Sequence, residues 1–79
     1  MRYNVIFICT GNSCRSQIAE GLLKEMASNI FNVYSAGINP SRLHPAAVSV
    51  MEEWGIDISY QKSEHLNEYI NRKIDIVIT

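Results

Sequence analysis

The sequence has few of the features that mark membrane proteins, nucleic-acid-binding proteins and disulfide-rich secreted proteins. Its formal net charge is −1 at pH 7, which leaves no basic excess for binding a polyanion or an acidic membrane surface. The longest apolar run, residues 5–9, is too short to span a bilayer, and residues 1–4 do not lead into a signal-peptide core. We therefore expect a cytoplasmic protein with neither a nucleic acid nor a membrane as its partner.

Cysteine is also scarce, because the 79 residues contain only Cys9 and Cys14. Two thiols within one short segment cannot cross-link distant parts of a fold, so their placement favours thiol chemistry in a reducing compartment. The length allows one small domain, residues 1–79. A sheet that is covered by helices on both faces normally needs a longer chain to bury its core.

The first part of the chain changes from a strand-like to a helix-like pattern and back. Residues 3–8 are β-branched and aromatic with an almost continuous apolar character, which predicts a central strand covered on both faces. From Gln17 onward, apolar residues recur at helical spacing, and Ser16 is a reasonable N-cap for this helix. Residues 31–36 then alternate into a second strand that ends at Gly37. This order predicts a parallel, right-handed βαβ unit.

The second part of the chain predicts two more helices and one more strand. A helix over residues 45–54 begins at a proline and ends before a glycine, with Trp54 in the core. Residues 64–71 predict a third helix, and residues 73–79 predict a third parallel strand. Because no helix follows to cover that strand, we expect an α/β fold that is truncated after its third strand, with an exposed edge where a dimer could form.

Between the first strand and the first helix lies a segment of small residues that opens with Cys9 and closes with Arg15. The backbone N–H groups of such a loop converge on a tetrahedral anion, and the dipole of the following helix adds to the attraction. The Arg15 guanidinium can hold two oxygens of that anion at once. The predicted oxyanion-binding residues are Thr10, Gly11, Asn12, Ser13, Cys14 and Arg15.

The same surroundings are expected to lower the pKa of Cys9 and to make it a nucleophile toward a bound phosphate or arsenate. Ser16 can donate a hydrogen bond to its sulfur, and Gly11 offers a positive φ for close backbone approach. The predicted catalytic residues are therefore Cys9, Arg15 and Ser16. The alternative is a tight turn from strand to helix in which Arg15 only meets a surface carboxylate.

These residues resemble a known signature. The stretch Cys9-Thr10-Gly11-Asn12-Ser13-Cys14-Arg15-Ser16-Gln17, followed by Ala19-Glu20-Gly21, is similar to that of the low-molecular-weight tyrosine phosphatase superfamily. Gln17 stands where the phosphatases usually have proline, and glutamine is typical of the thioredoxin-coupled arsenate reductases. Residues 32–38, 56–59 and 75–79 resemble the reductases as well. The resemblance implies a phosphotyrosine phosphatase I-like, three-layer α/β/α fold with a parallel sheet of four strands.

The resemblance also implies a reaction, the reduction of arsenate to arsenite. Cys9 attacks arsenate that the loop and Arg15 hold, two further cysteines resolve the adduct, and thioredoxin reduces the resulting disulfide. An aspartate that is followed by proline protonates the leaving oxygen. Neither the resolving cysteines nor this acid occur among residues 1–79. We therefore expect this chain to resemble the N-terminal part of such an enzyme and to lack a complete catalytic cycle.

Two other functions stay open at this stage. A phosphatase acting on phosphotyrosine or small phosphate esters would use the same loop through a thiophosphate intermediate, although Gln17 argues against it. A fragment without the acid and the resolving thiols could bind phosphate, sulfate or arsenate without turnover. Cys14 could then close onto Cys9 as a slow substitute for a resolving thiol.

Some reductases of this kind place a potassium ion beside the loop. Asn12, Glu20, Ser35 and Glu64 match its ligands in kind, whereas Lys62 stands where those members have a small hydroxyl residue. An ammonium at that position could replace the cation, so we expect that no cofactor is required. The alternative is that Glu20 and Glu64 are solvated helix charges. Nothing arranges the two histidines as a metal site.

Overall fold

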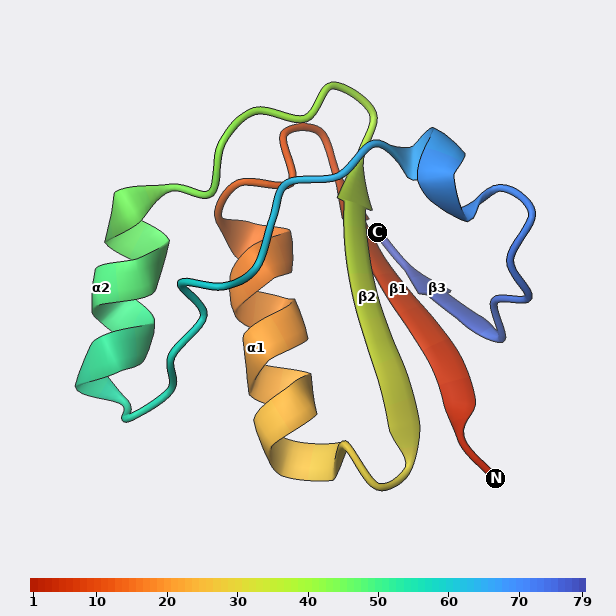
Figure 1. Cartoon of the computed structure of the whole chain (residues 1–79), viewed down its shortest axis with the longest axis horizontal. Coiled ribbons are helices and arrows are strands. Elements are labelled where there is room, and N and C mark those ends of the chain that lie inside the picture. The colour runs from red at the N-terminus through yellow and green to blue at the C-terminus, as the bar shows by residue number, and fades with distance from the viewer.

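The strand β1 (Tyr3–Cys9) lies at the centre of a parallel sheet in the computed structural model, which describes residues 1–79. The strand order is β2-β1-β3, with Tyr3 of β1 opposite Phe31 of β2 and Val5 opposite Ile76 of β3. The other elements in chain order are α1 (Arg15–Ala27), β2 (Phe31–Gly37), α2 (Pro45–Glu53), the 3₁₀ helix η1 (Leu66–Tyr69) and β3 (Ile76–Ile78) (Figure 1).

The two faces of the sheet have different cover. Helix α1 lies along the face formed by Val5, Phe7 and Ser35, while η1 brings Tyr69 onto the opposite face, against Ile6 and its neighbours. Because side chains alternate along a strand, β1 contributes to both contacts. The fold is therefore the predicted three-layer parallel α/β arrangement, with three strands in this chain.

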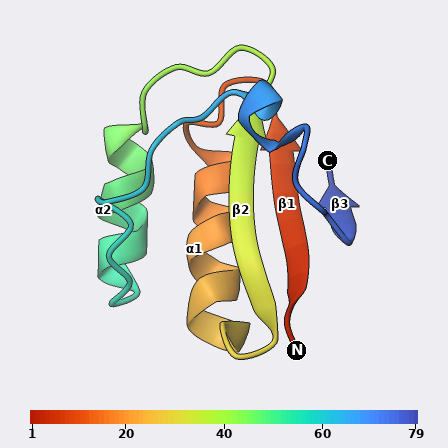
Figure 2. The same cartoon turned by 45° about the vertical axis from the view of Figure 1, so that its right-hand side comes forward.

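Helix α2 packs against α1 and not directly on the sheet. In Figure 1 and in Figure 2, α1 lies between the sheet and α2. The buried side chains of Ala47 and Met51 meet Ile58, and partly buried residues of α1, including Ile18 and Leu22, pack around them. This second apolar cluster fixes the direction of α1 and hence of its N-terminus.

Several predicted details are wrong. Ser16 is not the N-cap, because α1 already begins at Arg15 and the capping residue Cys14 makes no side-chain cap hydrogen bond. Trp54 is 73% exposed instead of buried, since it follows α2 and caps its C-terminus. The expected helix over residues 64–71 is the single turn η1, which His65 caps through its side chain.

The third strand is shorter than predicted and poorly covered. Only Ile76–Ile78 pair with β1, and all of them are exposed. Just before these residues, Asn4 and Asp75 exchange hydrogen bonds of 2.7 and 2.8 Å, which fix the register.

No helix of the fold has the length and apolar character needed to cross a membrane.

Candidate active site

The loop between β1 and α1 is held from outside through its carbonyl groups. Three of them accept hydrogen bonds of 2.7 to 2.9 Å from backbone N–H groups of the segment that leads into α2. The pairs are Thr10 with Asn39, Gly11 with Ser41, and Ser13 with His44. Because these carbonyl oxygens are used on the outside, the loop can direct N–H groups inward.

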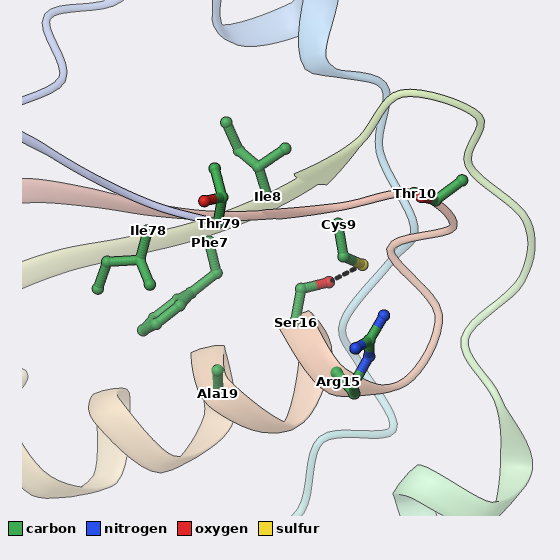
Figure 3. Close-up of a pocket in the computed structure, with 9 residues that line it drawn as sticks. All are labelled: Phe7, Ile8, Cys9, Thr10, Arg15, Ser16, Ala19, Ile78 and Thr79. Atoms are coloured by element: carbon green, nitrogen blue, oxygen red, sulfur yellow. Dashed lines mark hydrogen bonds between the residues drawn. The ribbon is translucent and has the colours of Figure 1, made fainter.

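The inward N–H groups and one hydroxyl meet at the sulfur of Cys9. The Asn12 N–H donates to Cys9 Sγ over 3.1 Å. Ser16 Oγ lies 2.9 Å from the same sulfur, as Figure 3 shows. Burial alone raises the pKa of Cys9, but hydrogen bonds from the Ser16 hydroxyl and from the backbone of Asn12, Ser16 and Ser13 outweigh it. The net result is a lowered pKa, so the thiolate is favoured.

Asn12 is the residue on which the loop turns. It is fully buried and adopts the left-handed conformation, with φ of 46°. The positive φ was expected at Gly11, but Gly11 has none, and the positive φ occurs one residue later, at Asn12. Asparagine tolerates the left-handed region better than most residues with a side chain. Its Oδ1 accepts a hydrogen bond from Gln17 Nε2 at 3.1 Å and lies 2.9 Å from Ser16 Oγ, whose one proton is shared between this oxygen and the Cys9 sulfur.

A buried amide network supports this conformation from behind. Gln17 Nε2 also donates to the backbone oxygens of Asn12 and Lys62, each at 2.9 Å. Gln61 Nε2 donates to Gln17 Oε1 over 2.7 Å, and Ser63 Oγ donates to the Asn12 carbonyl over 2.6 Å. Residues 61–64 therefore form a supporting segment that fastens the loop to the start of α1.

Gly37 at the end of β2 is required by the close approach of the loop. A Cβ atom at this position would lie 2.6 Å from the Thr10 carbonyl oxygen and 3.0 Å from the Asn12 nitrogen. Both are backbone atoms, so neither can turn away. The Gly37 N–H in turn donates to the Glu64 carbonyl over 2.8 Å, which joins β2 to the supporting segment.

A cleft of about 390 Å³ opens beside the sulfur. Arg15 and Cys9 lie at its polar end, whereas Phe7, Ile78 and Ala19 form an apolar wall (Figure 3). The Arg15 side chain is exposed and makes no salt bridge, since the one salt bridge of the chain joins other residues. The alternative interpretation required Arg15 to meet a surface carboxylate, and no such contact is present. Its guanidinium is therefore free for an anion.

This arrangement can bind a tetrahedral anion next to a nucleophilic sulfur. The positive end of α1, inward N–H groups and an unpaired guanidinium all attract negative charge. The same groups stabilise the thiolate, so an oxyanion and the sulfur occupy one electrostatic site. Of the predicted oxyanion-binding residues, Thr10 is exposed, Gly11, Ser13 and Cys14 are partly buried, and Asn12 is fully buried.

The four residues matched to a potassium site lie around the end of β2, but their oxygens already have partners. Glu20 contacts Ser35 Oγ and accepts from Lys24 Nζ at 2.5 Å, and Glu64 accepts from Tyr69 OH at 2.5 Å. Burial and the Glu64 hydrogen bond raise the pKa of Tyr69. Lys62 is exposed and its ammonium contacts neither carboxylate. Nowhere in the fold do three or more His, Cys, Asp or Glu side chains form a group that could hold a metal ion.

Three residues that support the loop were not predicted from the sequence. Gln61 and Ser63 carry no local signal, because they reach the loop only through the tertiary fold. Gly37 was identified only as the end of a strand, although a glycine opposite a loop that contains asparagine could have suggested close backbone contact.

Comparison with known proteins gives a consistent result. A family model described as low molecular weight phosphotyrosine protein phosphatase matches residues 4–79. An arsenate reductase of Bacillus licheniformis is 52% identical over 75 residues, which cover 95% of this chain and 54% of that protein. The chain thus spans about half the length of the curated relatives it matches.

Solved structures agree with the sequence relatives. An arsenate reductase in a phosphate-binding state has a TM-score of 0.89 and 44% identity, over 95% of this chain and 57% of that one. A low molecular weight protein tyrosine phosphatase from T. tengcongensis has a TM-score of 0.84 and 34% identity, over 95% of this chain and 56% of that one. Both branches of the resemblance therefore share this fold.

Proposed function

Because this chain belongs to the low molecular weight phosphotyrosine protein phosphatase family, we propose that it carries the oxyanion site and the nucleophile of an arsenate reductase. The observation that supports this most strongly is the convergence of Asn12 N–H and Ser16 Oγ on Cys9 Sγ, at 3.1 and 2.9 Å. Arsenate is favoured because relatives that are 52% and 51% identical to this chain are named arsenate reductases, and because the resemblance of the signature associates Gln17 with that branch.

The reaction divides into two steps. The Cys9 thiolate attacks arsenic, an S–As bond forms, and one As–O bond breaks as its oxygen leaves, once protonated, as water. A second thiol then attacks the Cys9 sulfur, an S–S bond forms, and the S–As electron pair stays on arsenic. Arsenic(V) thereby becomes arsenic(III), while two thiols become one disulfide.

Arg15 and the loop N–H groups act in the first step. They hold the arsenate oxygens and stabilise the charge that develops when sulfur attacks. For the second step, the resemblance places the resolving thiols beyond position 79, and Cys14 is the other thiol among these residues. We propose thioredoxin as the reductant of the final disulfide. The 79-residue chain alone is expected to bind the anion and to supply the nucleophile of the first step, but to turn over little or not at all without the acid that protonates the leaving oxygen and the resolving thiols.

Two measurements test this division. Arsenate or phosphate should protect Cys9 from alkylation in the wild-type chain, and Arg15→Ala should remove most of this protection. With arsenate, thioredoxin, thioredoxin reductase and NADPH, the chain should consume NADPH only near the background rate, with Cys9→Ser as the blank. Sustained consumption that depends on Cys9 would show that no further thiol is needed.

A phosphatase is the second candidate, because the phosphatase from T. tengcongensis shares the fold. The same thiolate can attack phosphorus and release an alcohol, after which water hydrolyses the thiophosphate. Hydrolysis of p-nitrophenyl phosphate in the same preparation distinguishes the two: turnover there without any adduct formation from arsenate favours the phosphatase. Anion protection of Cys9 with neither reaction identifies an oxyanion-binding module.

For the cation site, we propose that no added cofactor is needed. The Lys24 ammonium already pairs with Glu20, so the charge that would attract potassium is largely neutralised. In this proposal Lys24 supplies the ammonium, since Lys62 is exposed and pairs with neither Glu20 nor Glu64. Phosphate protection of Cys9 should therefore agree within about twofold between potassium and tetramethylammonium buffers of equal ionic strength.

Two further proposals concern the surroundings of the chain. We propose a cytoplasmic location, because a reactive thiolate at Cys9 requires a compartment that keeps thiols reduced. We also propose that copies of this chain can pair through the outer edge of β3, since the strand order leaves that edge unpaired and its apolar side chains are exposed. Sedimentation over a range of concentrations measures this association, and Val77→Lys should weaken it.

A further inference from the structure

We propose that Ser63 is a positioning residue of the oxyanion loop, whose hydroxyl orients the peptide group between Asn12 and Ser13 so that its N–H faces the Cys9 sulfur. The proposal rests on the proposed role of Cys9 as the nucleophile. The test measures the reactivity of the Cys9 thiol and not arsenate turnover. A failure of the proposed function and a failure of this proposal are therefore distinguishable.

One peptide group connects Ser63 to the surroundings of the Cys9 sulfur. Ser63 Oγ donates to the Asn12 carbonyl oxygen over 2.6 Å. That carbonyl and the Ser13 N–H belong to the same planar trans peptide, in which the two bonds point in opposite directions. A donor that holds the oxygen on one side therefore directs the Ser13 N–H to the other side, and the backbone of Ser13 is one of the groups that lower the pKa of Cys9.

The contact from Ser63 opposes strain in the backbone of Asn12. Asn12 has φ of 46°, a conformation that a residue with a side chain keeps only when its surroundings enforce it. Its carbonyl accepts two hydrogen bonds, from Ser63 and from Gln17 Nε2 at 2.9 Å. The Gln17 amide is shared among three acceptors, whereas the Ser63 hydroxyl has the Asn12 carbonyl as its only partner.

Ser63 is itself held in place. The neighbouring Lys62 carbonyl accepts from Gln17 Nε2, and the Glu64 carbonyl accepts from the Gly37 N–H at 2.8 Å and from Asn12 Nδ2 at 3.4 Å. The backbone on both sides is thus fixed to the loop and to β2. A hydroxyl on such a fixed backbone can transmit a defined orientation instead of following the loop.

The test compares Ser63→Thr with Ser63→Val. The two side chains have nearly the same shape, but only threonine keeps the hydroxyl, so their difference reports the hydrogen bond and not the packing. Ser63→Ala removes the hydroxyl with less steric change. Ser49→Ala is the control, because Ser49 is an exposed serine of α2 that makes no side-chain hydrogen bond.

The readout is the rate at which iodoacetamide alkylates Cys9, measured from pH 5 to 10 and assigned by fragment mass spectrometry, with urea unfolding to verify the fold. Valine and alanine should raise the apparent pKa of Cys9 and slow alkylation near neutral pH about threefold to tenfold relative to threonine and wild type. Ser49→Ala should match wild type. Coinciding pH profiles for the threonine and valine variants, whatever their stability, would overturn the proposal.

Discussion

The oxyanion loop and the strand β3 differ strongly in the contacts that hold them in place. Asn12 alone exchanges hydrogen bonds with Cys9, Ser16, Gln17, Ser63 and Glu64, and no part of it reaches solvent. Strand β3 pairs over only three residues, with side chains that are 39%, 57% and 43% exposed. Many polar contacts from distant segments fix the loop. Strand β3 is held by its short backbone pairing with β1 and by the pair of hydrogen bonds between Asn4 and Asp75, which we call the clamp of β3.

This difference separates two kinds of contribution to a fold. The reactive part of the chain uses buried polar groups, each of which becomes costly when it loses its partner. The strand at the edge uses exposed apolar groups and backbone pairing, which contribute little to stability and open independently. We therefore expect substitutions near the loop to act on the whole fold and substitutions near β3 to act locally.

The largest expected effect is at the contact between β2 and the loop. Gly37→Ala forces the Thr10 carbonyl and the Asn12 nitrogen away from the new Cβ, since both are backbone atoms within 3.0 Å of it. Overpacking of this kind is expected to lower the free energy of unfolding by about 1–3 kcal/mol and to slow alkylation of Cys9. Urea unfolding and the alkylation rate near neutral pH measure the two effects.

Gly11→Ala is the matched comparison. Its Cβ would meet Ser13 Oγ at 3.3 Å and Ser41 Oγ at 3.4 Å, and these side chains can turn. We expect a cost below about 1 kcal/mol, because the contact is relieved without moving backbone. Equal losses from the two substitutions would contradict the view that close backbone approach, and not the presence of glycine as such, is what the loop requires.

The order of elements around the loop could be predicted from the sequence because it depends on local patterns. The apolar run that ends at Cys9, the helical periodicity after Ser16 and the glycine at position 37 place strand, loop and helix without any tertiary information. The supporting network could not be predicted, because Gln61 and Ser63 lie more than forty residues from the groups they contact. Hydrogen bonds at that separation leave no periodicity in a sequence.

The errors in the second half of the chain have the same cause. Trp54 was expected in the core as part of the helix over residues 45–54, but α2 directs Ala47 and Met51 inward and leaves Trp54 beyond its end. The apolar residues of the segment 64–71 matched a helix, whereas the backbone of Glu64 is bonded to Gly37 and only one 3₁₀ turn forms. Tertiary contacts override local preference in both places.

A smaller and more local effect is expected at the clamp of β3. Asp75→Ala removes the carboxylate that accepts from the Asn4 N–H over 2.7 Å, while the Asp75 N–H can still donate to the Asn4 carbonyl. A loss of about 1 kcal/mol should speed amide hydrogen exchange in Ile76–Ile78 about fivefold and leave the loop amides unchanged.

Asp57→Ala is the control for that substitution, because its exposed carboxylate accepts from Ser59, away from the sheet. It should leave exchange in β3 as it is in the wild type. If Asp75→Ala accelerates exchange in the loop as much as in β3, the two regions unfold together and the contrast between them fails.

The smallest effect is expected in the pH dependence of stability that Cys9 contributes. Its pKa is lowered in the folded chain, because the hydrogen bonds to its sulfur outweigh burial, so the unfolded chain binds more protons between that pKa and the ordinary thiol value of about 8.5. The free energy of unfolding should therefore rise with pH across this window and level off above it. Below the lowered pKa, the contribution is absent. Urea unfolding from pH 5 to 9 should show this rise as a difference between wild type and Cys9→Ala, while Cys14→Ala, which keeps the Cys9 sulfur, should follow the wild-type slope. A parallel course for wild type and Cys9→Ala would mean that the loop holds its shape without favouring the thiolate.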